Sequence, residues 1–268
     1  MQIQKIMKNL LLLLAISLVF SCKEDKKENK DYSKETLNIT TSIYPDNLNK
    51  VYNAHGGIDN WNKFSSLTFT MQKSSGKEQT ITDLKKRYSL IEMPNHSIGY
   101  NGEVVWLHSK DTTAYKGNPK FYYNLMFYFC AMPFILGDDG IHYEESKPLV
   151  FEGKSFLGIK ISYEKGIGES PDDEYIMYYD PETYKMSWLA YTVTYFTQEK
   201  SKEFHFLQYT NWQEIEGLLL PETITWYNYE NNKPTSQRNN ITFTEVTISK
   251  EKPDSGLFQK PENAQIIN

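Results

Sequence analysis

Apolar and polar residues alternate in short segments along most of this chain. Successive side chains of a β-strand point to opposite faces of a sheet, so a period of two predicts strands with one buried face. Residue types that tolerate tight bends, such as Glu216-Gly217, lie between the segments, and Asn101-Gly102 is the clearest hairpin signal. We therefore predict a mainly β fold of antiparallel strands. The alternating positions are Leu67/Phe69/Met71, Tyr175/Met177/Tyr179, Leu189/Tyr191/Val193/Tyr195, Phe204/Phe206, Ile224/Trp226 and Ile241/Phe243.

A helix is expected at the start of the folded part, within residues 45–64. Leu48, Val51 and Tyr52 stand at i, i+3 and i+4, which places them on one apolar stripe. The proline at position 45 suits a helix start, and Gly56-Gly57 ends the helical pattern. This opening segment is predicted to pack on the sheet.

The segment from Phe121 to Leu136 is apolar nearly all round. Its composition predicts a helix that runs up to Pro133, because proline cannot continue one. A helix without a polar face is either enclosed by protein or exposed to an apolar ligand or a membrane. Two interpretations follow. The segment completes the core, or it lines or gates a lipid pocket.

Residues 1–21 predict a bacterial export signal that is removed. Lys5 and Lys8 precede an apolar run that is shorter than the ~20 residues of a membrane span. The stretch Leu18-Val19-Phe20-Ser21-Cys22 resembles a lipobox, so we expect Cys22 to be acylated and to hold the chain at a membrane. An ordinary secretory signal with an incidental Cys22 is the alternative.

Residues 22–43 form the predicted tether between the anchor and the domain. Lys23 to Asp31 has almost no apolar content, so it cannot pack and is expected to stay solvated. Lys23-Glu24-Asp25 also resembles the short export signals that follow the lipidated cysteine in Bacteroidota lipoproteins of the outer membrane. We expect an outer-membrane lipoprotein at the cell surface or on the periplasmic face, with one domain over residues 44–268.

Charge and spacing argue against several classes of function. Lys and Arg number 29 against 34 Asp and Glu, a formal net charge of −5, whereas nucleic-acid binding needs clustered basic residues. Cys130 lies in an apolar run and is expected to pack as a small hydrophobe. No two histidines have metal-ligand spacing, so we expect no metal. The sequence has no Gly-x-Ser-x-Gly elbow, and no helix is expected after Gly166-Ile167-Gly168 to bind a dinucleotide, so we also expect no catalytic residue and no cofactor. The histidines are His55, His96, His108, His142 and His205.

His55 lies directly before the glycine pair that ends the predicted helix. An imidazole N–H at that place can bind the last carbonyl oxygens of the helix, and a partly protonated ring favours this arrangement. We expect this structural role for His55 in preference to that of a catalytic base.

The order of elements and several stretches resemble the LolA/LolB-like superfamily, the outer-membrane lipoprotein-sorting-like proteins. The likeness covers roughly residues 44–262, and within the superfamily it points to Bacteroidota lipoproteins of unknown function. The resemblance implies an α+β, mainly β fold in which a curved antiparallel half-barrel sheet wraps around helices and encloses a cavity for acyl chains. The stretches are Ala54-His55-Gly56-Gly57 before Trp61, Tyr100 to Trp106, Tyr179 to Tyr184, Gly217 to Pro221, and Phe258 with Pro261.

Our leading hypothesis is a noncatalytic, monomeric carrier or receptor that takes an acyl chain or another hydrophobic ligand between the sheet and the Phe121 to Leu136 segment. One alternative is a surface-interaction module with a filled core that binds glycan or protein. A second is a hydrolase whose groups converge from distant segments. The candidate cavity residues are the large apolar side chains Phe69, Met71, Trp106, Phe127, Phe134, Trp188 and Trp226.

Overall fold

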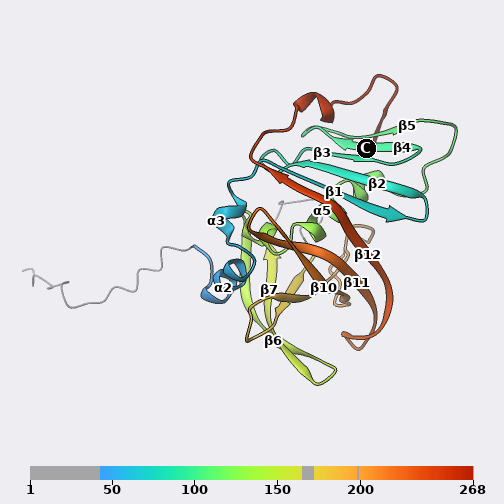
Figure 1. Cartoon of the computed structure of the whole chain (residues 1–268). Helices are drawn as coiled ribbons and strands as arrows, with labels where there is room; N and C mark the ends of the chain where they lie inside the picture. Colours follow the sequence, from blue (N-terminus) through green and yellow to red (C-terminus); the bar gives the residue numbers. More distant parts are fainter. Residues whose placement is uncertain (1–42, 165–171, 198, 268) are drawn as a thin grey trace, which may run out of the picture. The chain divides into compact units, whose positions relative to one another are not determined.

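The alternating segments form antiparallel strands of one sheet (Figure 1). The computed structural model describes residues 43–164, 172–197 and 199–267, so the expected signal 1–21, Cys22 and nearly all of the tether lie outside the described residues. Within the described part, the sheet has 13 strands in the order β13-β5-β4-β3-β2-β1-β12-β11-β10-β9-β8-β7-β6. The prediction of a mainly β, antiparallel fold is confirmed. The strands are β1 (Ser66–Lys73), β2 (Gly76–Asp83), β3 (Ser89–Glu92), β4 (His96–Tyr100), β5 (Val105–Ser109), β6 (Ile141–Phe151), β7 (Lys154–Tyr163), β8 (Tyr175–Tyr179), β9 (Met186–Tyr191), β10 (His205–Ile215), β11 (Leu218–Glu230), β12 (Lys233–Ser249) and β13 (Gln265–Ile267).

Most neighbours in the sheet are also neighbours in the sequence. The exceptions are β12, which pairs with β1, and β13, which pairs with β5. The long strand β12 therefore joins the first five strands to the later ones, and the sheet curves past α5 (Figure 1). This curvature leaves room for the helices on one face.

The short helices bury their apolar residues against the sheet. In α2, the buried residues are Leu48, Val51 and Tyr52, so the predicted apolar stripe is confirmed. The Asn118 side chain accepts from the backbone N–H of Phe121 and caps α4. The helices are α2 (Asp46–Ala54), α3 (Ile58–Trp61), α4 (Pro119–Tyr122), α5 (Leu125–Cys130), η1 (Phe134–Gly137) and η2 (Ser255–Phe258).

The apolar segment from Phe121 to Leu136 is broken, whereas the sequence predicts one helix up to Pro133. Asn124 has a backbone φ of −128° and starts a new helix, α5, which ends at Cys130. Asparagine favours such helix starts over helix interiors. The Cys130 side chain is fully buried, and burial raises the pKa of its thiol, so it packs as a small hydrophobe.

The predicted strand from Leu189 to Tyr195 is wrong beyond Tyr191, where β9 ends. The backbone N–H and the hydroxyl of Thr194 donate to Asp173 Oδ1 at 2.6 and 2.8 Å. The Asp173 carboxylate thus accepts the hydrogen bond from the Thr194 backbone that a carbonyl of a neighbouring strand would accept if β9 continued. Periodicity alone does not detect this competition.

Buried apolar residues lie on both faces of the sheet. The main cluster fills the face that carries α2 to α5, and a second cluster around Trp188 lies on the other face of β8 to β10. A third cluster around Trp106 lies under the C-terminal segment, whose Phe258 carbonyl accepts from Trp106 Nε1 at 3.0 Å. Among the described helices, none has the length and apolar character that crossing a membrane requires.

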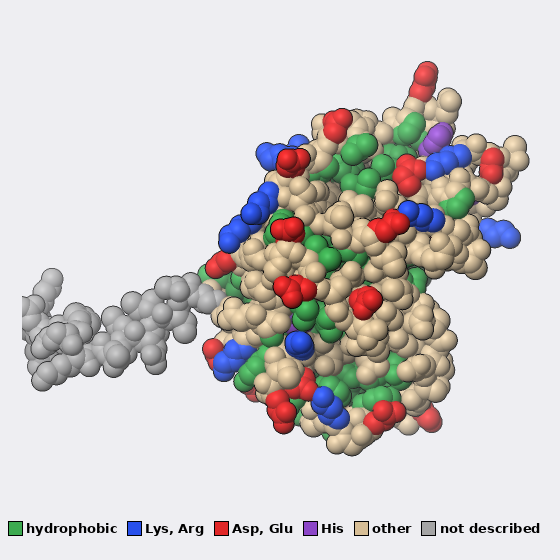
Figure 2. All heavy atoms as spheres, viewed as in Figure 1, with side chains coloured by type: hydrophobic (Ala, Val, Ile, Leu, Met, Phe, Trp, Pro, Cys, Tyr) green, Lys and Arg blue, Asp and Glu red, His purple; other side chains and the backbone are tan. Residues whose placement is uncertain are grey.

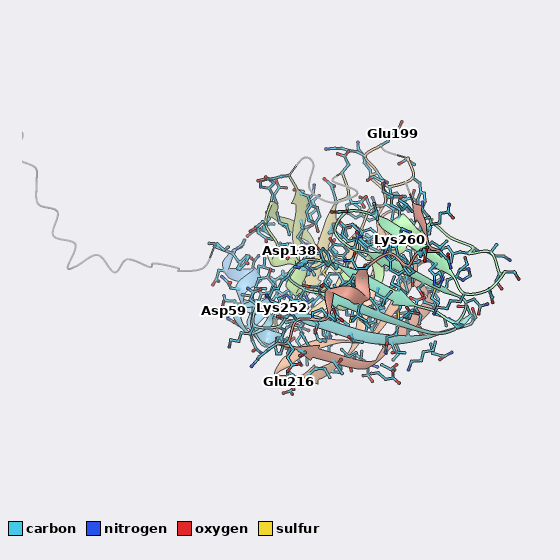
Figure 3. All side chains as sticks on the ribbon, turned by 90° about the horizontal axis from the view of Figure 1, so that it is seen from above. Asp59, Asp138, Glu199, Glu216, Lys252 and Lys260 are labelled. Atoms are coloured by element: carbon cyan, nitrogen blue, oxygen red, sulfur yellow. The ribbon has the colours of Figure 1, made fainter. Side chains whose placement is uncertain are left out.

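Charged side chains of both signs are interspersed on the face shown in Figure 2. Seen from above, Glu199 and Glu216 lie at opposite edges of the drawn fold, with Asp138 between them (Figure 3). Of these three carboxylates, Asp138 belongs to the pocket described next.

Candidate functional site

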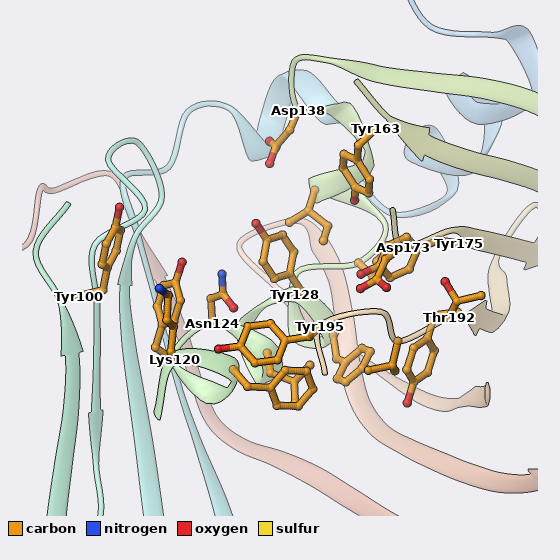
Figure 4. Close-up of a pocket in the computed structure, with 18 of the residues that line it drawn as sticks. Tyr100, Lys120, Asn124, Tyr128, Asp138, Tyr163, Asp173, Tyr175, Thr192 and Tyr195 are labelled. Atoms are coloured by element: carbon orange, nitrogen blue, oxygen red, sulfur yellow. The ribbon is translucent and has the colours of Figure 1, made fainter. Parts of the chain in front are cut away.

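The segment from Phe121 to Leu136, with its short helices, is called the helical insert. A cavity of about 470 Å³ lies between this insert and one end of β7, β8 and β9 (Figure 4). The insert supplies an apolar wall, and tyrosines from the three strands supply the facing wall. The cavity thus lies where the leading hypothesis expects it, between the sheet and the segment from Phe121 to Leu136. Lining residues of the insert are Phe121, Tyr123, Asn124, Leu125, Tyr128, Phe129, Met132 and Ile135, and those of the three strands are Tyr163, Tyr175 and Tyr191.

Strand register brings the three tyrosines together. Tyr175 pairs with Tyr191, and the ring centroids of Tyr163 and Tyr175 are 5.9 Å apart. The Tyr191 hydroxyl accepts from Trp226 Nε1 at 3.0 Å. Burial raises the pKa of Tyr175 and of Tyr191, so both stay neutral and their hydroxyls keep a proton to donate.

Two aspartates on the cavity lining are held by partners from the chain. Asp138 pairs with Arg87 Nη2 at 2.5 Å, and Asp173 accepts both hydrogen bonds of Thr194 described above. Burial raises the pKa of each carboxyl, against the opposing effect of these partners. Figure 4 shows Asp173 beside Tyr175, with Asp138 at another side of the cavity.

A smaller recess of about 160 Å³ adjoins the cavity. Four residues, Tyr100, Tyr123, Asn124 and Tyr128, line both spaces. The remaining lining of the recess comes from the ends of β2 and β3, the turn between them and α5, namely Thr82, Lys86, Arg87, Ser89 and Phe127.

The seven side chains predicted to line a cavity are buried in three different clusters. None of them lines the 470 Å³ cavity, and Phe127 lines the recess. Trp226 contacts the cavity wall indirectly, through Tyr191 and Phe129. A role of the seven in ligand binding stays a prediction. Phe69, Met71, Phe127, Phe134 and Trp226 belong to the main cluster, Trp188 to the second and Trp106 to the third.

The tyrosines of the facing wall are the residues that sequence reasoning missed. Tyr175 and Tyr191 stand in the alternating pattern, and Tyr163 follows two residues after a buried isoleucine, so the strand signal includes them. Nothing in that signal tells which end of a strand meets the insert. Selection by side-chain size favoured tryptophans, which the fold buries in close packing.

His55 lies at the end of α2, outside the cavity lining. Its Nε2 accepts from the backbone N–H of Met186 at 3.4 Å, so Nδ1 carries the proton and donates to the Val51 carbonyl at 2.7 Å. The predicted bond to a helix carbonyl is present, but the predicted partial protonation is wrong. Burial lowers the pKa of His55 to about 4, because a charged ring would lose its hydration there.

This lowered pKa predicts a pH-dependent stability. The unfolded chain, with a His pKa of about 6.5, binds more protons than the folded chain between pH ~6.5 and ~4, so stability is full above the unfolded pKa and falls as pH falls through this window. We expect His55 to contribute a loss of about 3 kcal/mol between pH ~7 and pH ~4. Urea unfolding of wild type and His55→Gln at both pH values measures the difference.

His205→Gln is the matched control, because His205 is only half-buried and a charged ring there keeps part of its hydration. This control should leave the pH dependence nearly that of wild type. An equal pH dependence in wild type and His55→Gln would contradict the assignment to His55.

Comparison with known proteins gives one family and several similar folds. A model described as "Family of unknown function (DUF6503)" matches residues 69–238. No curated protein matches the chain. A LolA superfamily protein from Nitrosomonas europaea has 8% identity and a TM-score of 0.44, with 73% of this chain and 88% of that chain covered.

Two further solved structures are similar to this chain. A DUF1329 family protein from Desulfovibrio piger has 13% identity and a TM-score of 0.46, with 80% of this chain and 98% of that chain covered. A lipoprotein-sorting protein domain from Vibrio parahaemolyticus has 6% identity and a TM-score of 0.40, with 74% and 93% covered. At these identities the likeness concerns the fold alone.

Proposed function

We propose that this chain, which belongs to the Family of unknown function (DUF6503), binds the apolar part of an amphiphile without catalysis. The binding site is the cavity beneath the helical insert. The cavity carries the proposal. Its volume of about 470 Å³ falls in the range of small-molecule sites, and its lining combines an apolar wall with tyrosine hydroxyls. An acyl chain suits such a space, because it needs apolar contact along its length and few directed hydrogen bonds.

The location of the protein forms part of the same proposal. Acylation of Cys22 after removal of residues 1–21 would anchor the chain to the outer membrane, on the surface or the periplasmic side. The tether over 22–43 would then hold the domain over 44–268 close to lipids. A cavity for an acyl chain is useful there, since its ligand is a component of the membrane itself.

The hydrolase alternative has no specific observation in its favour among the described residues. The half-buried Asp138 and the buried Asp173 are each engaged by a partner of the chain. The interaction module remains as the outcome that follows if no apolar ligand enters the cavity.

Chain length should control affinity if the cavity takes an alkyl chain. Burial of one CH₂ group contributes about 0.8 kcal/mol, so each added CH₂ should raise the affinity about fourfold until the space is full. Isothermal titration calorimetry with straight-chain alcohols of increasing length measures this. An affinity that does not depend on length would contradict apolar burial.

Filling the cavity should abolish this binding. Leu125 lies on the apolar wall and is only partly buried, so Leu125→Trp is expected to project into the space and weaken binding at least about tenfold. Leu257→Trp is the matched control, because Leu257 is 44% exposed in η2 and outside the cavity lining. If both variants bound the alcohols equally well, the cavity would not be the binding site, and the surface-interaction module would replace the carrier as our proposal.

A further inference from the structure

The recess beside the cavity is built by the turn between β2 and β3. Asp83 Oδ1 accepts from the backbone N–H groups of Lys85 and Lys86 at 2.8 and 2.9 Å. The backbone N–H of Arg87 donates to the Asp83 carbonyl at 2.8 Å, and Arg87 has a φ of +60°. These bonds fix the turn that brings Lys86 and Arg87 to the recess lining.

The Arg87 guanidinium contacts a carboxylate and an aromatic ring, and one of its nitrogen atoms has no acceptor among the described residues. Nη2 pairs with Asp138, and the guanidinium carbon lies 5.3 Å from the centroid of the Phe127 ring. Nη1 is buried and has no hydrogen-bond partner in the described part of the chain. A buried N–H that gives up water without finding an acceptor costs free energy, so an oxygen atom that enters here would be favoured.

Thr82 supplies a second orphaned group on the same lining. Its side chain is 2% exposed, and its Oγ1 has no partner within the described residues. Ser89, by contrast, already donates to the Tyr123 carbonyl at 3.1 Å. The recess therefore combines two cations, Lys86 and Arg87, with an unused N–H and an unused hydroxyl.

Charge distinguishes the recess from the cavity. No aspartate or glutamate is among the described residues that line the recess, although its Arg87 pairs with Asp138 of the cavity lining. The cavity lining also includes Asp139 and Asp173, with Lys120 as the one cation among its described residues, whereas the recess has Lys86 in addition to the paired Arg87. An anionic group is repelled by carboxylates at close range and attracted by lysine and arginine. It would therefore be more stable in the recess than in the cavity.

The two spaces are neighbours that share four lining residues. Figure 4 shows Asn124 and Tyr128, which line both, between Tyr100 and Tyr175. We infer that the recess binds the anionic end, a carboxylate or phosphate, of the amphiphile whose apolar part lies in the cavity. This inference rests on the proposed function and adds the chemistry and the direction of the ligand.

The test compares dodecanoate with dodecanol at about pH 8, where the acid is ionised. Wild type is expected to bind the acid at least about tenfold more tightly than the alcohol, because hydrogen bonds to a charged group are the strong ones. Equal affinities would overturn the inference and leave the cavity intact. Failure of both ligands to bind would instead contradict the proposed function.

Two threonines provide matched variants. Thr80 and Thr82 lie on the same face of β2, both are buried, and the Oγ1 of each has no partner within the described residues, but only Thr82 lines the recess. Thr82→Val should reduce the preference for dodecanoate about fivefold and leave dodecanol unchanged. Thr80→Val should change neither affinity. The same effect from both variants would overturn the inference.

A double variant tests the guanidinium while keeping the charge balance. Arg87→Gln alone would leave the half-buried Asp138 carboxylate without its cation, so it is combined with Asp138→Asn. The preference for the acid should disappear in this protein. Inorganic phosphate should displace dodecanoate but not dodecanol from wild type if the recess holds the anion. Displacement of both ligands would contradict the assignment of the anionic end to the recess.

Discussion

Gly56→Ala should destabilise the fold by at least ~4 kcal/mol, whereas Gly57→Ala should cost about 1–3 kcal/mol. Both glycines have positive φ, +97° and +89°, which side chains rarely adopt. They differ in surroundings. A Cβ on Gly56 would lie 2.1 Å from the Gly217 carbonyl oxygen and 2.9 Å from the Leu218 Cα, and a Cβ on Gly57 would meet nothing within 4 Å.

The atoms that a Cβ on Gly56 would meet have little freedom to move. They belong to the turn between β10 and β11, and the backbone N–H of Leu219 donates to the His55 carbonyl at 2.9 Å. Relief of the clash would break this bond or shift the hairpin. Urea unfolding of the two variants gives the comparison. An equal loss of stability would show that backbone strain, and not the contact with Gly217, dominates.

The contact between Gly56 and Gly217 illustrates what the sequence could and could not predict. Gly56-Gly57 indicated the end of a helix, and Glu216-Gly217 indicated a turn, and the structure has both features. Their contact depends on residues about 160 positions apart. Local patterns report the conformation of a segment, but only the packed fold decides which segments meet.

Strands were predictable where one face is buried and the other is solvated. β1 has this arrangement at Leu67, Phe69 and Met71, and its pattern identified it. β12 is largely exposed over its first half, so only Ile241 and Phe243 indicated a strand 17 residues long. Burial on both faces also weakens the signal, because alternation then disappears.

The place of the cavity was predictable, but its lining was not. The uninterrupted apolar character of the insert required a second apolar surface or a ligand, and the cavity lies beside it. The residues of the facing wall depend on curvature and on which strand ends approach the insert. Size and a place on a predicted strand selected Trp106 and Trp188, which pack on the face of the sheet away from the main cluster.

Trp188→Ala should destabilise the chain by about 3–5 kcal/mol without weakening ligand binding. The indole is completely buried and packs against the rings of Phe151 and Tyr227, whose centroids each lie 4.8 Å from its own and 5.4 Å from each other. This cluster lies on the face of β8 to β10 opposite the cavity wall. Loss of the ring leaves a void there, and the tyrosines on the other face keep their contacts.

Trp226→Ala is the matched variant, because Trp226 belongs to the main cluster and supports two residues of the cavity wall. Its ring lies 5.8 Å from that of Phe129, and its Nε1 donates to the Tyr191 hydroxyl. A similar loss of stability is expected, but here with at least about tenfold weaker binding of dodecanol, since the wall loses its support. Calorimetric titration well below each unfolding midpoint separates the two effects. If Trp188→Ala weakened binding as much as Trp226→Ala, the loss of affinity would follow from the lower stability of the whole fold. That result would contradict the assignment of the binding site to the cavity beneath the insert.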